Sequence, residues 1–296
     1  TDPPTFTNQT GGTLMKFHMD TAQVFVPDGL DASEALPRTT HLAIGAHQDD
    51  LEIMAMDGIL KCFQQPDQWF TGVVVTNGAG SPRAGVYEKY TDDDMRAVRF
   101  REQEKAAVLG EYAAQIMLDY PSSTIKDGGN KNPVDDLALI LEQTQPKVLY
   151  THNLADKHDS HVAVVLRVIE AVRRLPKEQR PRAIHGCEVW RDLDWLDDED
   201  KLALDVSAHE NLQMALVGIF DSQIAGGKRY DLATMGRRRA NATYHASHAT
   251  DVATGFTFAM DLTALAEDDG LDPAELAQNH IDRFKADVGE RIKKSS

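Results

Sequence analysis

The segment AHQDDLE, residues 46–52, carries one imidazole and two adjacent carboxylates at a spacing that suits metal binding. His47 and Asp50 are three residues apart, and residues at this spacing on the first turn of a helix project from one face and can share a ligand. Asp49 lies between them, close enough to contact a water at the metal without binding the metal itself. An acidic pair before a helix is also a common N-terminal cap, so this segment alone does not distinguish a metal site from a helix cap.

A second segment, DKHDSH at residues 156–161, repeats this spacing far downstream. His158 and His161 are again three residues apart, at the start of a predicted helix. Catalytic zinc sites typically combine three nitrogen or oxygen ligands with one position left open for water. Because each of the two segments follows a predicted strand, their coincidence in one chain predicts a single metal site with an open position.

Strands and helices alternate along the part of the sequence that carries these segments. Short apolar runs predict the strands, and apolar residues at helical spacing predict the helices. We expect strands over 22–26, 41–45, 70–76, 114–118, 147–151, 183–189, 202–206 and 255–261. We expect helices over 51–63, 93–109, 134–143, 159–173, 210–224, 234–245 and 271–294. This order predicts an α/β fold, with a Rossmann-like, mostly parallel sheet, helices on both faces and a C-terminal α/β elaboration.

Such a fold would bring the two ligand segments together. Strands 41–45 and 147–151 are expected to be neighbours where the strand order of the commonest doubly wound sheet reverses. Ligands of open α/β sheets bind outside the carboxyl ends of the strands at this reversal. Because segments 46–52 and 156–161 follow these two strands, we expect them to meet there.

Composition and charge restrict the class of partner. Of the 296 residues, 42% are hydrophobic and 26% are charged, as in ordinary soluble globular proteins. Acidic residues outnumber basic ones 47 to 31, and the net charge of −16 disfavours nucleic acid or an anionic membrane surface as a partner. No apolar run of about 18 residues predicts a membrane span. Without the pattern of a signal peptide, the expected location is cytoplasmic.

The chain shows no internal repeat and no clear linker, so we expect one domain over 1–296. Within it we distinguish an N-terminal arm over 1–37, a Rossmann-like core with the metal site over 38–192, and a C-terminal elaboration over 193–296. Apolar helix faces do not distinguish an internal core from a contact between copies of the chain. A homo-oligomer is therefore left open.

Four segments resemble motifs of the LmbE-like, or PIG-L, family of zinc-dependent N-deacetylases. AHQDDLE at 46–52 resembles the family's AHPDDxE motif, and DKHDSH at 156–161 is similar to its DxHPDH segment. The run 102–110, with Arg99 ahead of it, resembles the helix of the form R-x-x-E…A…L-G. HASH at 245–248 resembles the late HxSQ motif. The four segments occur in the family's order.

Carried over residue by residue, the resemblance implies that His47, Asp50 and His161 bind zinc. It implies that Asp49 is the general base and that His158 stabilises the oxyanion or handles a proton. The family has a Rossmann-like parallel sheet and acts mostly on N-acetylglucosamine conjugates. The resemblance thus predicts a zinc-dependent hydrolase that removes the acetyl group from an N-acetylglucosamine-type amide by metal-activated water. Another divalent metal such as Fe²⁺ also suits these ligands.

The motifs depart from the family pattern at positions other than the implied ligands. Gln48 replaces the usual proline of the first motif, and Asp159 and Ser160 stand where the second usually has proline and aspartate. The missing aspartate leaves open what supports the neighbouring histidines. Either Asp156 or Asp159 could hold the ring of His158.

Four residues are expected to contact the sugar: Arg83, Arg99, Arg101 and His245. Arg83 lies in the Gly-rich loop that follows strand 70–76, on the same edge of the sheet as the metal motif, and His245 would line the pocket opposite the metal. For Arg99 and Arg101, a helix-surface salt bridge with Glu102 or Glu104 is an equal alternative. The basic run at 237–239 is interpreted as a solvated helix face.

Two other classes of protein fit some of these residues. Two histidines and one carboxylate also describe the facial triad of non-haem Fe(II) oxygenases, and His47-x-Asp49 with a distant histidine satisfies their pattern. Those enzymes generally have double-stranded β-helix folds, which the alternation of strands and helices disfavours. A catalytically silent sugar-binding module on the same scaffold is the third hypothesis. The exact substrate and pathway, the native metal and the role of the segment from residue 251 onward are not predicted.

Overall fold

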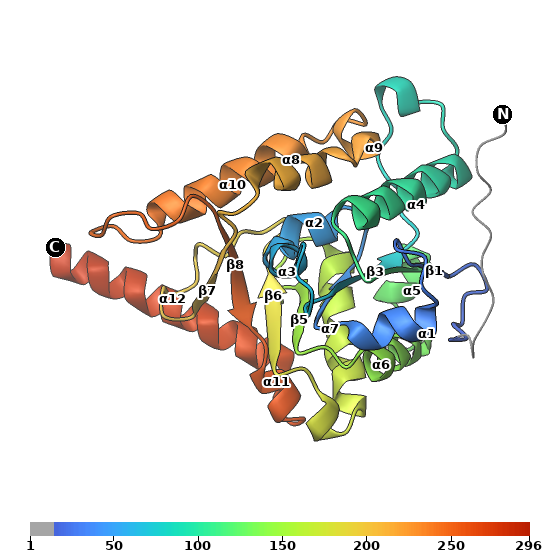
Figure 1. Ribbon diagram of the computed structural model, residues 1–296. Helices are drawn as coiled ribbons and strands as arrows, with labels where there is room; N and C mark the ends of the chain where they lie inside the picture. The colour runs from blue at the N-terminus through green and yellow to red at the C-terminus, as the bar shows by residue number, and fades with distance from the viewer. Residues whose placement is uncertain (1–14) are drawn as a thin grey trace.

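The computed structural model describes residues 15–296, and the first 14 residues of the predicted arm lie outside this range. An eight-stranded sheet runs through the described chain, in the order β1-β4-β3-β2-β5-β6-β8-β7 (Figure 1). The strands are β1 (Gln23–Phe25), β2 (His41–Gly45), β3 (Phe70–Thr76), β4 (Ala114–Tyr120), β5 (Val148–His152), β6 (Ala183–Cys187), β7 (Lys201–Asp205) and β8 (Phe256–Asp261).

The middle of the sheet is parallel and its edges are antiparallel. β4, β3, β2, β5 and β6 pair in parallel, with Leu42 of β2 opposite Thr71 of β3 and Leu149 of β5. β1 pairs antiparallel with β4, and β8 pairs antiparallel with both β6 and β7. The predicted mostly parallel, Rossmann-like sheet is confirmed. So is the expectation that strands 41–45 and 147–151 are neighbours.

Helices cover both faces of this sheet. They are α1 (Ala32–Ala35), α2 (Asp50–Met54), α3 (Met56–Cys62), α4 (Asp92–Leu109), α5 (Ser122–Lys126), α6 (Asn132–Thr144), α7 (Asp159–Arg174), α8 (Glu210–Gly218), α9 (Asp221–Ile224), α10 (Tyr230–Tyr244), α11 (Ala264–Glu267) and α12 (Pro273–Ser295). Short 3₁₀ turns occupy Leu36–Arg38, Gly85–Tyr87 and Lys177–Gln179. Within residues 15–296, no helix combines the length and the apolar character needed to cross a membrane.

Strand β2 shows how the two layers of core arise from the sequence. Successive side chains of a strand point to opposite faces of the sheet. Leu42 and Ile44 therefore pack in one core cluster with side chains of α6 and α7, whereas Ala43 packs in a second cluster with side chains of α2, α3 and α4. Figure 1 shows α2 and α3 on one side of the sheet and α6 and α7 on the other.

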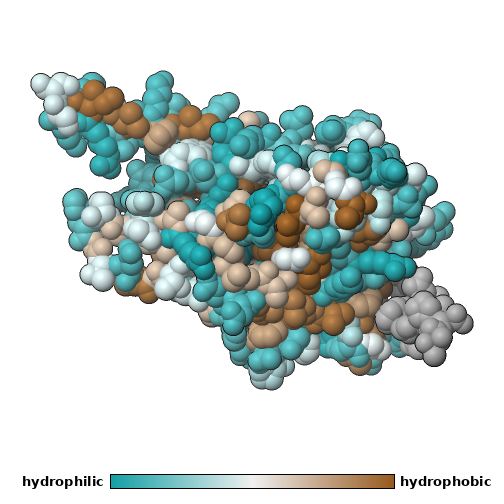
Figure 2. Space-filling view, turned by 90° about the horizontal axis from the view of Figure 1, so that it is seen from above, coloured by the Kyte–Doolittle hydropathy of each residue, from teal (hydrophilic) through white to brown (hydrophobic). Residues whose placement is uncertain are grey.

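The outer surface agrees with the charged composition. Seen from above the view of Figure 1, hydrophilic residues cover most of the surface, and hydrophobic residues gather toward the middle of that face (Figure 2). Charged side chains are costly to bury and remain in water where they have no partner. The excess of acidic residues is therefore mostly carried by solvated groups.

The predicted helix over 51–63 is interrupted at Ala55, so that it forms α2 and α3. The guanidinium of Arg238 donates hydrogen bonds to the carbonyl oxygens of Glu52, at 2.7 Å, and Ile53, at 3.1 Å. In a continuous helix these oxygens would accept from N–H groups four residues further on. A side chain from a distant segment thus takes the place of the helix continuation.

The predicted helix over 210–224 is also divided, into α8 and α9. The carboxylate of Glu102, in α4, accepts hydrogen bonds from the backbone N–H of Ser222 at 2.7 Å and from its hydroxyl at 2.6 Å. The first N–H groups of a helix have no partner within it, and a carboxylate that binds one of them stabilises a new helix start. Glu102 therefore supports the start of α9.

Candidate metal centre

The two ligand segments meet at the carboxyl edge of the sheet. β2 ends at Gly45 and leads into α2, and β5 ends at His152 and leads into α7. Because β2 and β5 are adjacent and parallel, the turns that follow them lie at the same edge. His47 and Asp50 from the first turn therefore face His161 from the second.

His47, Asp50 and His161 form a cluster that can hold a metal ion. The separations are 3.2 Å from His47 Nδ1 to Asp50 Oδ2, 3.3 Å from His161 Nε2 to Asp50 Oδ2, and 3.3 Å between the two histidine nitrogens. Tetrahedral zinc with bonds of about 2.0–2.1 Å places its ligand atoms about 3.3–3.4 Å apart. The three side chains are thus preorganised for an ion of this size.

A further histidine, His152, packs behind the cluster. Its ring stacks on that of His161 with centroids 3.8 Å apart, and its Nε2 lies 3.4 Å from Asp50 Oδ2. That nitrogen accepts a hydrogen bond from the N–H of Ala46 at 2.9 Å, so its lone pair is not free for a metal. Burial lowers the pKa of His152 to about 4, which keeps the ring neutral. His152 was not among the predicted site residues, although a histidine at the carboxyl end of a central strand is a signal for one.

Asp156 supports His161 on the side away from the other ligands. Its Oδ2 lies 3.5 Å from His161 Nδ1, and its two oxygens accept hydrogen bonds from the N–H groups of His158, at 2.9 Å, and Trp190, at 3.1 Å. A carboxylate behind a metal-binding imidazole fixes the orientation and tautomer of the ring. The expectation that one of the two acids holds the ring of His158 is wrong, because Asp156 faces His161 and Asp159 is exposed.

The carboxylates around His161 control its protonation. Burial alone would lower the pKa of His161, but the charges of Asp50 and Asp156 raise it to about 9. Burial would likewise raise the pKa of Asp50, yet the positive charge of His161 holds it well below its usual range. A metal ion competes with a proton for the His161 lone pair. Metal uptake is therefore expected to release a proton, and metal affinity to fall as the pH falls.

Asp49 lies beside the three ligands and faces the cavity. Its backbone φ of 92° is in the left-handed region, which is strained for a residue with a side chain and is found preferentially at functional sites. Burial raises the pKa of Asp49 to about 8, against the opposing charge of Arg99, whose Nη2 lies 3.4 Å from Asp49 Oδ2. A buried carboxylate with a raised pKa beside a metal site has the properties of a general base.

Gln48 links Asp49 to the neighbouring strand. Its Nε2 donates to the carbonyl of Thr76 at 3.2 Å, and its Oε1 accepts from Arg99 Nε at 3.2 Å. Arg99 Nη2 also donates to the backbone carbonyl of Gln48. Gly78, with φ of +68°, is required here, because a Cβ would lie 2.4 Å from Gln48 Oε1 and 3.0 Å from Arg99 Nε. The glutamine that replaces the family's proline thus has a structural role of its own.

His158 is half-buried, with its ring centroid 5.0 Å from that of His47 and 6.1 Å from that of Trp190. Its Nδ1 accepts a hydrogen bond from the N–H of Ser160 at 3.3 Å, which places the ring proton on Nε2. Burial, and then the charges of His161 and His47, lower its pKa to about 4. At neutral pH His158 is therefore a neutral hydrogen-bond donor.

The metal cluster opens into a cavity of about 780 Å³. His47, Asp49, Asp50 and His158 line one part of it. The other charged and aromatic residues of its wall are Arg99, Lys126, Lys157, Glu188, Trp190, Lys228, Tyr230, Arg237 and Arg238. Cavities that bind small molecules typically measure about 300–1,000 Å³, so this one can hold a small substrate.

Of the arginines predicted to contact substrate, Arg99 lines the cavity. It is only 2% exposed and points toward Asp49, so the alternative of a helix-surface salt bridge with Glu102 or Glu104 is wrong for Arg99. Arg101 is exposed on α4, and it does not belong to the cavity wall.

The remaining two predicted residues are held elsewhere. Arg83 forms an ion pair with Asp92 at the start of α4. His245 follows α10 and packs against Phe256 and Phe258, with ring centroids 5.1 and 5.8 Å apart. The structure therefore does not bring Arg83 or His245 to the cavity wall.

The basic run at 237–239 is not a uniformly solvated helix face, contrary to expectation. Arg238 is 3% exposed and lies against the end of α2. Arg237 donates to the carbonyl of Val189 and lines the cavity. Of the three, only Arg239 is exposed. Two of the three arginines thus shape the site.

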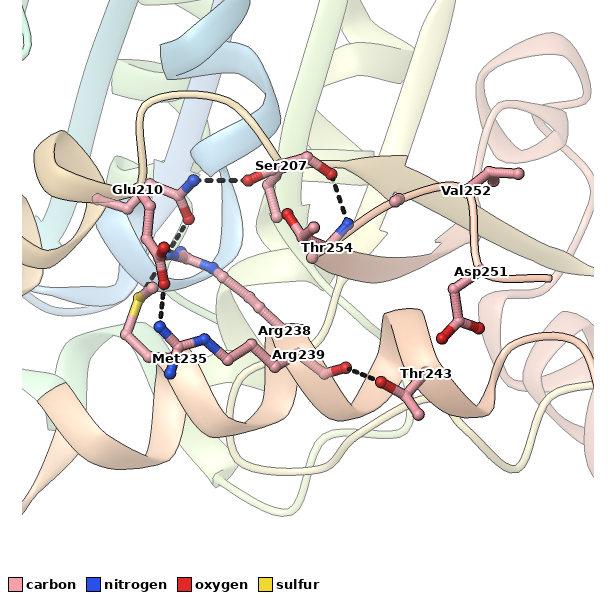
Figure 3. Close-up of a pocket in the computed structure, with 13 residues that line it drawn as sticks. Ser207, Glu210, Met235, Arg238, Arg239, Thr243, Asp251, Val252 and Thr254 are labelled. Carbon is pink, nitrogen blue, oxygen red and sulfur yellow. Dashed lines mark hydrogen bonds and ion pairs between the residues drawn. The ribbon is translucent and has the colours of Figure 1, made fainter.

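A second cavity, of about 460 Å³, lies between α8, α10 and the loop before β8 (Figure 3). Its polar groups are largely paired with one another. Arg239 pairs with Glu210, and the hydroxyl of Ser207 accepts from the N–H of Thr254 at 2.9 Å. Arg238 borders both cavities, but none of the three metal ligands lines this one. It is separate from the candidate metal centre.

The fold and the cluster define an α/β protein with a candidate metal site at the carboxyl edge of its sheet. The sequence profile of the PIG-L family, described as GlcNAc-PI de-N-acetylase, matches residues 42–172. This part of the chain is a PIG-L family domain, and it contains His47, Asp49, Asp50, His158 and His161. Among curated proteins, none matches the sequence.

Solved structures with a similar fold include enzymes with different reactions. The 4-carboxy-2-hydroxymuconate hydratase of Pseudomonas putida has 15% identity and a TM-score of 0.56, with 76% of this chain and 95% of that chain covered. The N,N'-diacetylchitobiose deacetylase of Pyrococcus horikoshii has 18% identity and a TM-score of 0.55, with coverages of 75% and 83%. A zinc-inhibited form of teicoplanin deacetylase has 15% identity and a TM-score of 0.53, with coverages of 76% and 98%. These likenesses show a shared fold, which does not by itself decide the reaction.

Proposed function

We propose that the protein is a metal-dependent N-deacetylase that hydrolyses the acetyl amide of an N-acetylglucosamine-type compound. The observation that carries this proposal is the triangle of ligand atoms on His47, Asp50 and His161, with the carboxylate of Asp49 beside it at a cavity. The PIG-L domain and the deacetylases among the similar structures support the class of reaction. Zinc is the proposed metal because three nitrogen and oxygen ligands at these separations suit it, and Fe²⁺ is the alternative.

The residues around the cluster match the needs of amide hydrolysis. Zinc in such a site lowers the pKa of water to about 7 and polarises a carbonyl group. Asp49 is proposed to take the proton of the attacking water. A bound dication would lower the pKa of Asp49 from about 8, so that the base would be ionised at neutral pH. The same proton then passes from Asp49 to the leaving nitrogen, and acetate and a free amine are released.

His158 is proposed to stabilise the carbonyl oxygen, which gains negative charge as the amide is attacked. Its Nε2–H is available because Nδ1 is occupied by the N–H of Ser160. A neutral donor aimed at a developing oxyanion stabilises it without a proton transfer. Arg99 holds Asp49 from the other side, so that the base and the donor are separately positioned.

The cavity wall suits an amino sugar. The rings of Trp190 and Tyr230 lie 6.0 Å apart and nearly perpendicular, at 88°, and both line the cavity. Aromatic faces pack against the apolar face of a sugar ring, while neighbouring polar groups bind its hydroxyls. This combination supports a sugar-type substrate.

The rival hypotheses fit the site less well. The oxygenase hypothesis used the pattern His47-x-Asp49, but the cluster contains Asp50 instead, and the sheet is mostly parallel with helices on both faces. A silent binding module would have no use for a strained, buried carboxylate beside the ligands. Hydration of a carbon–carbon double bond also needs an activated water, and the fold shared with a hydratase makes it the principal alternative.

The test is amine release from a panel of N-acetylglucosamine derivatives by protein that carries one equivalent of zinc. Excess zinc is avoided because one similar structure is a zinc-inhibited form. Asp49→Asn is expected to keep the metal and lose activity by about 100-fold or more. Asp159→Asn, which removes an exposed carboxylate, is the matched control and should stay active. Parental activity of Asp49→Asn would refute its role as base, and no release from any compound would refute deacetylation.

A further inference from the structure

Three lysines line the metal cavity without a carboxylate partner. Lys126 ends α5, Lys157 directly precedes His158, and Lys228 lies between α9 and α10. Within residues 15–296, the lysines that form ion pairs are others: Lys61, Lys131, Lys201 and Lys294. Three separate segments thus bring lysines without an ion pair to one cavity, with Lys126 and Lys157 exposed and Lys228 half-buried.

The carboxylates of the cavity wall do not neutralise these lysines. Asp50 belongs to the metal cluster, and Asp49 lies against Arg99. Glu188 is buried and accepts hydrogen bonds from the N–H groups of Leu193 and Phe258 and from the side chain of Asn241. Other lysines of the described residues, such as Lys105 and Lys147, also form no ion pair, but here three of them line one cavity of a chain with a net charge of −16.

Lys228 is held close to the catalytic region. Its side chain is half-buried, and its Nζ lies 5.2 Å from the ring centroid of Trp190. Trp190 in turn stacks on His158. An ammonium group over an indole face is attracted to it, which keeps the charge at the cavity wall. The second cavity offers a contrast, because its exposed arginine, Arg239, already pairs with an acid.

We infer that the cavity binds an anionic substrate, whose carboxylate or phosphate group lies against Lys126, Lys157 and Lys228. The placement of the acetamido group at the metal ligands rests on the proposed function, but anion binding at the lysines does not depend on turnover. Ammonium groups bind phosphate and carboxylate as point charges. Cations that line a cleft also raise the local concentration of anionic substrates. The protein would thus select one charged class among N-acetylated compounds.

The inference is tested by binding measurements on Asp49→Asn with one equivalent of zinc, so that no probe is consumed. The probes are N-acetylglucosamine, N-acetylglucosamine 6-phosphate and N-acetylmuramic acid, which share the acetamido group and differ in charge. At low salt we expect at least one charged probe to bind about tenfold more tightly than the neutral one. The preference should shrink as salt is added. Which charged probe is preferred distinguishes a phosphate from a carboxylate.

Substitutions locate the effect. In the same background, Lys157→Gln and Lys228→Gln are each expected to weaken binding of the charged probe about two- to fivefold. Lys105→Gln, on an exposed lysine of α4 outside the cavity wall, is the matched control and should bind as the parent does. Equal affinities for charged and neutral probes would overturn the inference. So would undetectable binding of both charged probes, or a preference that is unchanged in the double variant Lys157→Gln/Lys228→Gln.

The two proposals can fail separately. Amine release from neutral compounds together with equal affinities would retain deacetylation and reject the anion subsite. Selective binding of a charged probe that depends on the lysines, without turnover of any compound, would retain the subsite and reject deacetylation.

Discussion

Asp156→Asn removes the negative charge behind His161 while preserving the size of the side chain. In the protein, one oxygen of Asp156 lies 3.5 Å from His161 Nδ1, and the two oxygens accept from the N–H groups of His158 and Trp190. An asparagine can accept at only one of these positions, so its NH₂ group must face an N–H at the other. The substitution therefore loosens the ring of a metal ligand as well as removing its counter-charge.

The expected loss of zinc affinity depends on pH. Removal of the carboxylate behind a metal-binding histidine typically costs about 10- to 100-fold in affinity, or about 1.4–2.7 kcal/mol. The charge of Asp156 also helps raise the pKa of His161 to about 9, so at pH 7 the parent must displace a proton from this ring. In the variant the pKa of His161 is lower, so a smaller fraction of the rings carries a proton that the metal must displace. The loss should therefore be smaller at pH 7 than at pH 9, because about half of the parent rings are already unprotonated at pH 9.

The assay is zinc affinity by competition with a chromogenic chelator at both pH values, with unfolding curves to verify that the variant is folded. Asp159→Asn is the matched control, because this acid is exposed in the same segment. A change of less than about threefold for Asp156→Asn at pH 9 would refute its supporting role, since the expected range begins at about tenfold. An equal loss in the control would show that the effect is not specific to the carboxylate behind His161.

Three further substitutions test other parts of the structure by denaturant unfolding. Gly78→Ala places a Cβ 2.4 Å from a buried glutamine oxygen at positive φ and should lower the free energy of unfolding by about 2 kcal/mol or more. The Cβ of the control Gly80→Ala meets no atom within 4 Å, and this variant should lose less than about 1 kcal/mol. Equal losses in the two variants would contradict the close approach at Gly78. Arg238→Met leaves two carbonyls of α2 without a donor and should lower the free energy of unfolding by about 2–4 kcal/mol. Burial disfavours the charged guanidinium and lowers its pKa to about 10, but the hydrogen bonds from this charged donor contribute more than its burial costs. Arg239→Met, at an exposed position, should change the stability by no more than about 0.5 kcal/mol, and a similar loss in both variants would argue against the helix contact. Burial lowers the pKa of His41 from 6.5 to about 4. Below pH 6.5 the unfolded chain therefore binds a proton that the folded chain does not, and the free energy of unfolding decreases as the pH is lowered from 6.5 to about 4. His41→Gln should reduce this acid-induced loss by about 3 kcal/mol, and an unchanged pH dependence would show that His41 does not cause it.

The features that the sequence predicted well depend on neighbouring residues. The mostly apolar run at 41–45 forms β2 because a strand buried on both faces needs predominantly apolar side chains. The spacing of His47 and Asp50 is likewise local, since a first helical turn places both on one face. Their meeting with His161 followed from the strand order, which the alternation of strands and helices made predictable.

The features that could not be predicted depend on contacts between distant segments. Nothing within 51–63 indicates that the helix ends at Ala55, because the cause is the guanidinium of Arg238. The same holds for Arg83, which an ion pair with Asp92 holds outside the cavity wall. Charged side chains form ion pairs with groups that are close in space, and residue types alone do not predict which groups these are.

The cavity is assembled from two stretches of chain with different tasks. The ligands, Asp49 and His158 lie within the matched residues 42–172, whereas Trp190, Lys228 and several other wall residues come from outside it. Exchange of the later stretch between related proteins would therefore be expected to alter which compounds are accepted while leaving the reaction type alone. Arg238 sets a limit on such exchange, because the helix that carries Asp50 ends on its side chain. A transplanted segment would have to bring an equivalent arginine and an equivalent of the Ser222 contact to Glu102, so selectivity can change only where these contacts are kept.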